Sequence, residues 1–150
     1  MRDVNRLSFQ LGMINCFAEM VAVGVKRLAI SPPLTPEDYE RVRDDSEAIV
    51  TGSGIRSHLE RSLLITDLQS PEFTQGKWSI LFFRDQSTLD AYQALKDRKA
   101  ALEEAGSYTL VARQEISRDF MRLLSYPEET IESKLKAEGK EDPFVLDMED

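Results

Sequence analysis

Apolar side chains recur at helical spacing through residues 4–25. The main row alternates steps of four and three, the repeat that places side chains on one face of an α-helix: Leu7, Leu11, Ile14, Ala18, Val21 and Val25. A second row widens the apolar surface beyond one face: Met13, Phe17, Met20 and Gly24. The remaining positions form a narrow polar row along the same helix: Asn5, Ser8, Gly12, Asn15 and Glu19. Such a helix is expected either at the centre of the domain or in the contact between two copies of the chain.

Short apolar segments predict strands. Residues 25–30 (VKRLAI) read as a strand that stops at two prolines, which cannot continue a ladder. The segment 55–68 reads as extended, and its part SLLIT, residues 62–66, is apolar enough for a buried strand. The clearest strand is WSILFF, residues 78–83.

Helix-start and helix-stop signals separate these strands. Thr35 followed by proline and two acids predicts an N-capped helix up to residue 51. A short helix is expected after residue 70, and a long one at 87–105 before a stopping glycine. An amphipathic helix is predicted from Ile116, and a last one begins at Tyr126-Pro127.

Strands that alternate with helices predict an α/β domain with a small, mostly parallel sheet of three to four strands and helices packed around it. The alternative is an α+β fold with a mixed sheet, in which one strand is reversed. We expect a single domain over residues 1–138. Residues 139–150 (GKEDPFVLDMED) are interpreted as an acidic, mobile tail.

The glycine-rich stretch TGSGIRSH, residues 51–58, raises the question of a phosphate-binding loop. A dinucleotide-binding loop has its glycines between a strand and a following helix, whereas these glycines follow a predicted helix. The third glycine of that motif is replaced by Ser57, and the Gly-Lys-Ser/Thr of a Walker loop is absent. We therefore interpret Gly52 or Gly54 as the left-handed residue that ends the helix.

Composition narrows the classes of partner. The chain has 150 residues with 41% apolar residues, 31% charged residues and a net charge of −8. An acidic chain with few local basic groups is a poor nucleic-acid binder, because phosphate neutralisation supplies most of that affinity. No apolar run reaches the ~20 residues of a membrane span, and the N-terminus does not read as a signal peptide. We expect a cytoplasmic protein that binds neither nucleic acid nor membrane.

The single cysteine and single histidine limit the chemistry. Cys16 falls on an apolar side of the first helix, so we expect a buried, unreactive thiol and no disulfide. The usual Cys and His metal motifs are missing, so no metal site is predicted. His58 would serve as a general base only if it faced a carboxylate at the sheet end. The alternative is a histidine on a strand or at the surface. No cofactor is indicated.

Polar residues follow each predicted strand at its carboxyl end. In a parallel sheet these ends meet at one rim, which is where open α/β sheets bind ligands. The predicted rim consists of Ser31, Thr66, Asp67, Arg84 and Asp85, with His58 as an outlying candidate. Arg84 would bind an anion, and Asp67 or Asp85 would act as acceptor or acid–base group. The alternative is that these residues only end strands and cap helices.

The functional expectation is therefore coarse. We predict a non-catalytic binding or regulatory domain that acts as a homodimer through its apolar first helix. The alternative is a small-molecule binder, or an enzyme, that takes a small anionic ligand at the strand-end rim. The sequence assigns no catalytic residue.

Overall fold

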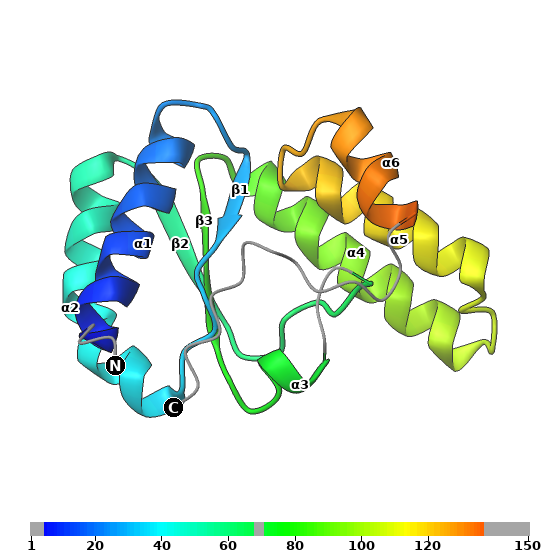
Figure 1. The fold of residues 1–150 in the computed structure, drawn as a ribbon, viewed down its shortest axis with the longest axis horizontal. Helices are drawn as coiled ribbons and strands as arrows, with labels where there is room; N and C mark the ends of the chain where they lie inside the picture. The colour runs from blue at the N-terminus through cyan, green and yellow to red at the C-terminus, as the bar shows by residue number, and fades with distance from the viewer. Residues whose placement is uncertain (1–4, 68–70, 137–150) are drawn as a thin grey trace.

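The computed structural model describes residues 5–67 and 71–136, in which helices pack on both faces of a three-stranded sheet (Figure 1). The elements of the described chain are α1 (Arg6–Ala22), β1 (Leu28–Ile30), α2 (Pro36–Ser53), β2 (Arg56–Glu60), α3 (Pro71–Thr74), β3 (Ser79–Phe83), α4 (Gln86–Glu104), α5 (Leu110–Leu123) and α6 (Glu128–Lys136). The acidic tail predicted at 139–150 lies outside the described residues.

The sheet is antiparallel, so the prediction of a mostly parallel sheet is wrong. Its strand order is β1-β3-β2, and β3 runs antiparallel to both neighbours. Phe83 lies opposite Leu28 on one side and Arg56 on the other. A parallel neighbour for β2 would need a long crossover connection, whereas the described part of the β2–β3 connection contains only the four-residue α3. The α+β alternative is compatible with this architecture.

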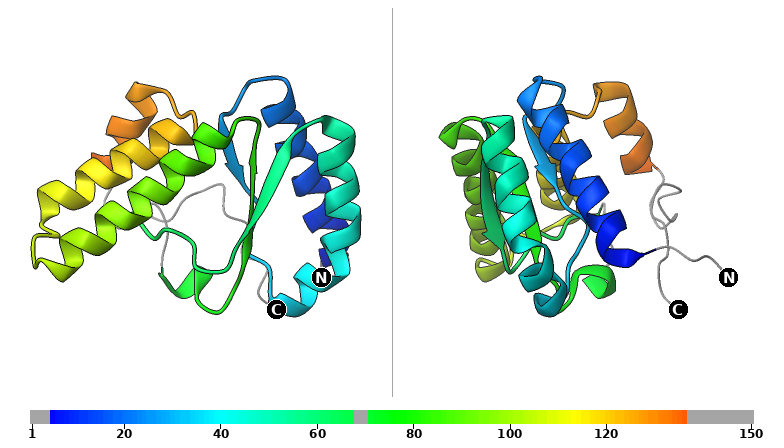
Figure 2. Two further views of the ribbon diagram at one scale, coloured as in Figure 1. Left: turned by 180° about the vertical axis from the view of Figure 1, so that it is seen from behind. Right: turned by 90° about the vertical axis from the view of Figure 1, so that its left-hand side faces the viewer.

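The central strand builds two hydrophobic cores, because its side chains alternate between the faces of the sheet. Ile80 and Phe82 pack into a core with α1 and α2, while Leu81 and Phe83 pack into a core with α4 and α5. All five residues of β3 are buried. Figure 2 shows the sheet between the α1–α2 layer and the layer of α4, α5 and α6.

The stretch 62–66 is a loop and not the predicted strand, although its leucines are buried. Leu64 is only 4% exposed, and its N–H donates to the Tyr92 hydroxyl over 2.9 Å. That hydroxyl donates in turn to the Glu60 carboxylate, also over 2.9 Å. Lys96 Nζ contacts the same carboxylate at 2.9 Å and the Ser62 carbonyl at 2.7 Å. Side-chain bonds from α4 therefore replace the ladder that a strand would have formed.

The first helix is as apolar as predicted, but its cysteine is not buried. Ile14, Ala18 and Val21 are fully buried in the α1–α2 core, and the predicted polar row is exposed. Cys16 is exposed, which corrects the expectation of a buried thiol. It belongs to a stripe on the side of α1 away from that core, which we call the outer stripe: Phe9, Met13, Cys16 and Met20. Its spacing of four, three and four is also helical.

The helix ends confirm the interpretation of TGSGIRSH. Thr35 accepts a hydrogen bond from the Asp38 N–H over 3.1 Å and caps α2 as predicted. Gly54 ends α2 with φ of 69°, in the left-handed region that glycine occupies without strain. The stretch is thus a helix end followed by β2. The amphipathic helix expected from Ile116 begins earlier, at Leu110, because Thr109 caps it through the Ala112 N–H.

Candidate functional site

The predicted strand-end rim does not assemble. Ser31 follows β1, where its hydroxyl accepts from the Ile80 N–H over 2.8 Å and donates to the Pro32 carbonyl over 3.1 Å. Arg84 and Asp85 follow β3, which runs the other way, so they lie at the opposite end of the sheet. Ser31 joins two strands and leaves no hydroxyl proton for a ligand.

The other predicted residues are also dispersed. Asp67 lies in the loop after β2, where it pairs with Arg113 at 2.5 Å and its N–H donates to the Ser117 hydroxyl over 3.3 Å. Thr66 is buried beside it. His58 lies in the middle of β2, opposite Leu81, and not at a sheet end. Asp67 therefore ties a loop to α5.

Arg84 and Asp85 each lie beside the end of a helix. A methyl group added at Gly24 would lie 3.6 Å from Arg84 Nη1, so the guanidinium sits beside the residues that follow α1. A cation there complements the negative C-terminal end of the helix. Asp85 occupies the N-cap position of α4 but makes no side-chain capping bond. Both residues are thus placed at helix ends.

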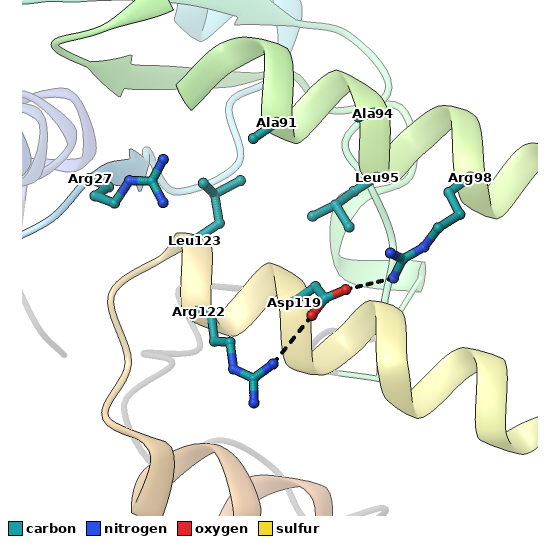
Figure 3. Close-up of a pocket in the computed structure, with 8 residues that line it drawn as sticks. All are labelled: Arg27, Ala91, Ala94, Leu95, Arg98, Asp119, Arg122 and Leu123. Carbon is teal, nitrogen blue, oxygen red and sulfur yellow. Dashed lines mark hydrogen bonds and ion pairs between the residues drawn. The ribbon is translucent and has the colours of Figure 1, made fainter. Parts of the chain in front are cut away.

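A cleft of about 380 Å³ opens between the start of β1, α4 and α5 (Figure 3). Residues from these three parts of the chain line this arginine cleft, and none belongs to the predicted rim: Arg27, Ala91, Ala94, Leu95, Arg98, Asp119, Arg122 and Leu123. Its floor is apolar, and its polar lining consists of three guanidiniums and one carboxylate. Helical spacing explains the α4 contribution, since Ala91, Leu95 and Arg98 follow steps of four and three.

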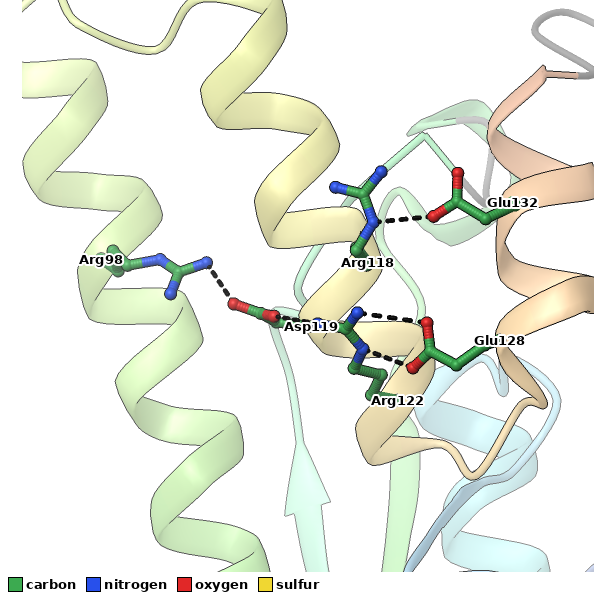
Figure 4. A network of polar contacts seen from close by, with 6 residues as sticks. All are labelled: Arg98, Arg118, Asp119, Arg122, Glu128 and Glu132. Atoms are coloured by element: carbon green, nitrogen blue, oxygen red, sulfur yellow. Dashed lines mark hydrogen bonds and ion pairs between the residues drawn. The ribbon is translucent and has the colours of Figure 1, made fainter.

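The far side of the cleft is held by an ion-pair network that joins α4, α5 and α6 (Figure 4). Asp119 accepts from Arg98 at 2.8 Å and from Arg122 at 3.5 Å. Arg122 also forms a forked pair with Glu128, with N–O distances of 2.6 and 3.1 Å. Hydrogen bonding to the Arg122 guanidinium holds the pKa of Glu128 below its usual value. The two arginines on this side are therefore already partly neutralised.

Arg27 differs from these two arginines. Its backbone N–H donates to the Ser125 hydroxyl over 2.9 Å, which fixes the start of β1 against the turn after α5. Among residues 5–67 and 71–136, its guanidinium has no hydrogen-bond or ion-pair partner. Figure 3 draws it on the side of the cleft away from Asp119. One full set of guanidinium donors therefore faces the cleft unused.

The sequence alone does not reveal this cleft. In the sequence Arg27 follows Lys26, and Arg122 belongs to a second basic group with Arg113 and Arg118. Nothing in this spacing brings residue 27 next to residues 98 and 122. The signal that the sequence does contain is the pattern within α4 and α5, where apolar residues and an arginine share one face of each helix. That pattern identifies a face of each helix but not the strand that closes the cleft.

Comparison with known proteins adds no assignment. No protein-family model, curated protein or solved structure gives a significant match to the chain. In the described ranges, no three His, Cys, Asp or Glu side chains gather in a group that could hold a metal ion. Likewise, the helices of the described chain include none with the length and apolar character needed to cross a membrane.

Proposed function

We propose that the protein is a non-catalytic binding domain that takes a small anionic ligand in the arginine cleft. The observation that carries the proposal is Arg27, whose guanidinium has no partner within the described chain and faces a cleft with an apolar floor. A guanidinium recognises carboxylate and phosphate groups through paired hydrogen bonds. Because the chain carries a net charge of −8, such a local excess of positive charge is a specific feature and not a general property of its surface.

The lining supports binding more than catalysis. Asp119 is the carboxylate of the lining, and it is held between Arg98 and Arg122. General acid–base catalysis needs a group within hydrogen-bond reach of the proton that it moves, whereas both carboxylate oxygens of Asp119 are already taken by arginines. Among the described residues, those that line the arginine cleft include no serine, cysteine, lysine or histidine. The cleft therefore offers charge and shape rather than a nucleophile.

Arg27→Gln tests the proposal. We expect the wild-type protein to bind at least one of acetate, hexanoate, inorganic phosphate and pyrophosphate, as followed by NMR titration. The substitution should weaken that binding about 10- to 100-fold, because a hydrogen bond to a charged group contributes about 1.5–3 kcal/mol.

Arg56→Gln is the matched control. Arg56 is an exposed arginine at the same end of the sheet, but it does not line the cleft. If a general electrostatic attraction caused the binding, both substitutions would weaken it equally. Equal losses, or no binding of any probe to the wild-type protein, would reject the anion-binding function.

Self-association through α1 is the second candidate function, and the outer stripe favours it. Its four residues are uncharged, and Cys16 among them is exposed. Two acidic chains that associate repel each other least through an uncharged face, and twofold dimers are the commonest assemblies. Sedimentation equilibrium of the wild-type protein and of a Met13→Lys variant tests this second proposal.

A further inference from the structure

Building on the proposed function, we infer that the ligand of the arginine cleft is a monocarboxylate with an apolar body, and not a phosphate or polyphosphate. Three features of the cleft support this class of anion: the balance of its charges, the separation of its charged ends and the apolar side chains between them.

The charge balance limits the ligand to about one negative charge. Three guanidiniums contribute to the cleft, and two carboxylates, Asp119 and Glu128, are paired with two of them. One positive charge, that of Arg27, is left uncompensated. A carboxylate of charge −1 neutralises it. A phosphate monoester carries about −1.5 to −2 at neutral pH, and a pyrophosphate more, so either would place excess negative charge beside Asp119.

The arrangement of the cleft calls for an apolar body behind that charge. In Figure 3 Arg27 lies on the left and the Arg98–Asp119 pair further to the right, with Leu123 and Leu95 drawn between them. A polyphosphate would lie along this apolar surface without hydrogen-bond donors to satisfy its oxygens. A hydrocarbon chain or ring would instead be removed from water there. The volume of about 380 Å³ suits a small metabolite, since ligand pockets span roughly 300–1,000 Å³.

The test compares probes that separate the charge from the body. ¹⁵N-labelled protein is titrated with acetate, hexanoate, hexanamide, inorganic phosphate and pyrophosphate. Hexanoate should bind more than tenfold tighter than acetate, because each buried methylene contributes about fourfold in affinity. Hexanamide, which keeps the body but loses the charge, should bind at least tenfold more weakly than hexanoate. Both phosphates should bind more weakly than hexanoate.

Ala94→Leu tests the apolar floor in the protein itself. Ala94 is exposed on α4 and lines the cleft, so leucine fills the space without disturbing a core. Hexanoate affinity should fall to that of acetate, while the affinity for acetate stays unchanged. The matched control is Ala100→Leu, which makes the same change at an exposed position of the same helix outside the cleft. It should leave both affinities as they are.

The outcomes separate this inference from the proposed function. If pyrophosphate binds more tightly than hexanoate and Arg27→Gln abolishes its binding, the anion site stands but the monocarboxylate class is wrong. If hexanoate binds no better than acetate, or Ala94→Leu leaves its affinity unchanged, the apolar body is wrong. If no probe binds in an Arg27-dependent way, both the inference and the proposed function fail.

Discussion

Tyr92 is the residue at which the loop after β2 is fixed to α4. Its ring is fully buried, and its hydroxyl accepts from the Leu64 N–H while donating to Glu60. Burial raises the pKa of this hydroxyl well above its ordinary value, so it stays a neutral donor at physiological pH. Burial alone would raise the pKa of Glu60, but hydrogen bonds from the Ser62 N–H, Lys96 and Tyr92 hold it below its usual value.

Removing this hydroxyl tests its contribution. Tyr92→Phe leaves the ring in place but strands the buried Leu64 N–H, which costs about 1–3 kcal/mol of unfolding free energy. Urea denaturation followed by circular dichroism measures the loss. Tyr39→Phe is the control, because in the described chain its hydroxyl has no hydrogen-bond partner although its ring packs against Trp78. A Tyr92→Phe midpoint equal to that of Tyr39→Phe would contradict the assignment.

Helix caps are the feature that single residues predict best from the sequence. Thr35 and Gly54 bound α2 as their chemistry requires, because a hydroxyl before a helix and a glycine after one act locally. Burial is harder to predict. The expectation for Cys16 is wrong, since α1 is apolar on two sides and its spacing does not tell which side meets the core. The contacts of Ser31 are likewise not visible in the sequence, because its hydroxyl accepts from a neighbouring strand.

Two helix glycines, one inside α1 and one at the end of α2, have opposite expected effects on stability. Gly12 lies inside α1 with open space around it, so Gly12→Ala should stabilise the protein by about 0.5–1 kcal/mol. Gly54 has a positive φ, so Gly54→Ala should destabilise it by about 1–2 kcal/mol. Thermal or urea unfolding of the two variants measures both changes in stability. Changes of the same sign would show that backbone conformation does not determine the effect of these substitutions.

The elements are largely predictable from the sequence, whereas their directions are not. Helices at 36–53 and 86–104 and the strand at 79–83 follow from periodicity and end signals. The stretch 62–66 resembles a strand in sequence because a short apolar run looks alike in a strand and in a buried loop. That false strand also favours the wrong, parallel pairing. Strand direction depends on which strands meet, and no local pattern carries that information.

Because α1 is apolar on two sides, we expect the protein to self-associate through this helix. Wild-type protein should sediment at twice the mass of one chain, and Met13→Lys should weaken association at least tenfold, because a lysine buried without a partner costs more than about 1.4 kcal/mol. Asn15→Lys adds the same charge on the exposed polar row of α1 and should leave the dimer intact. A wild-type monomer at every concentration, or equal effects of both lysines, would exclude association through the outer stripe.

The arginine cleft forms only when the separate parts of the chain pack together. Arg27, Arg98 and Arg122 come from three parts of the chain that are far apart in sequence, and only the packing of α4 and α5 on the sheet brings them together. Composition shows 19 lysines and arginines against 27 acidic residues, but it does not show that three of the arginines converge. Strand-end reasoning groups residues that lie at opposite ends of the sheet, because it assumes parallel neighbours whereas both strand pairs are antiparallel.

The position of β3 between β1 and β2 has a consequence for how the chain is made. Within residues 5–67 and 71–136, the two outer strands do not pair with each other, and each forms its ladder with residues 79–83. A nascent chain that has emerged only as far as β2 can form α1 and α2 but no sheet. The apolar core residues of these helices then lack the β3 side chains against which they pack in the complete chain. Sheet assembly during synthesis therefore waits until residues 79–83 have been made, and an isolated fragment that ends before β3 would expose the apolar faces that the complete chain buries.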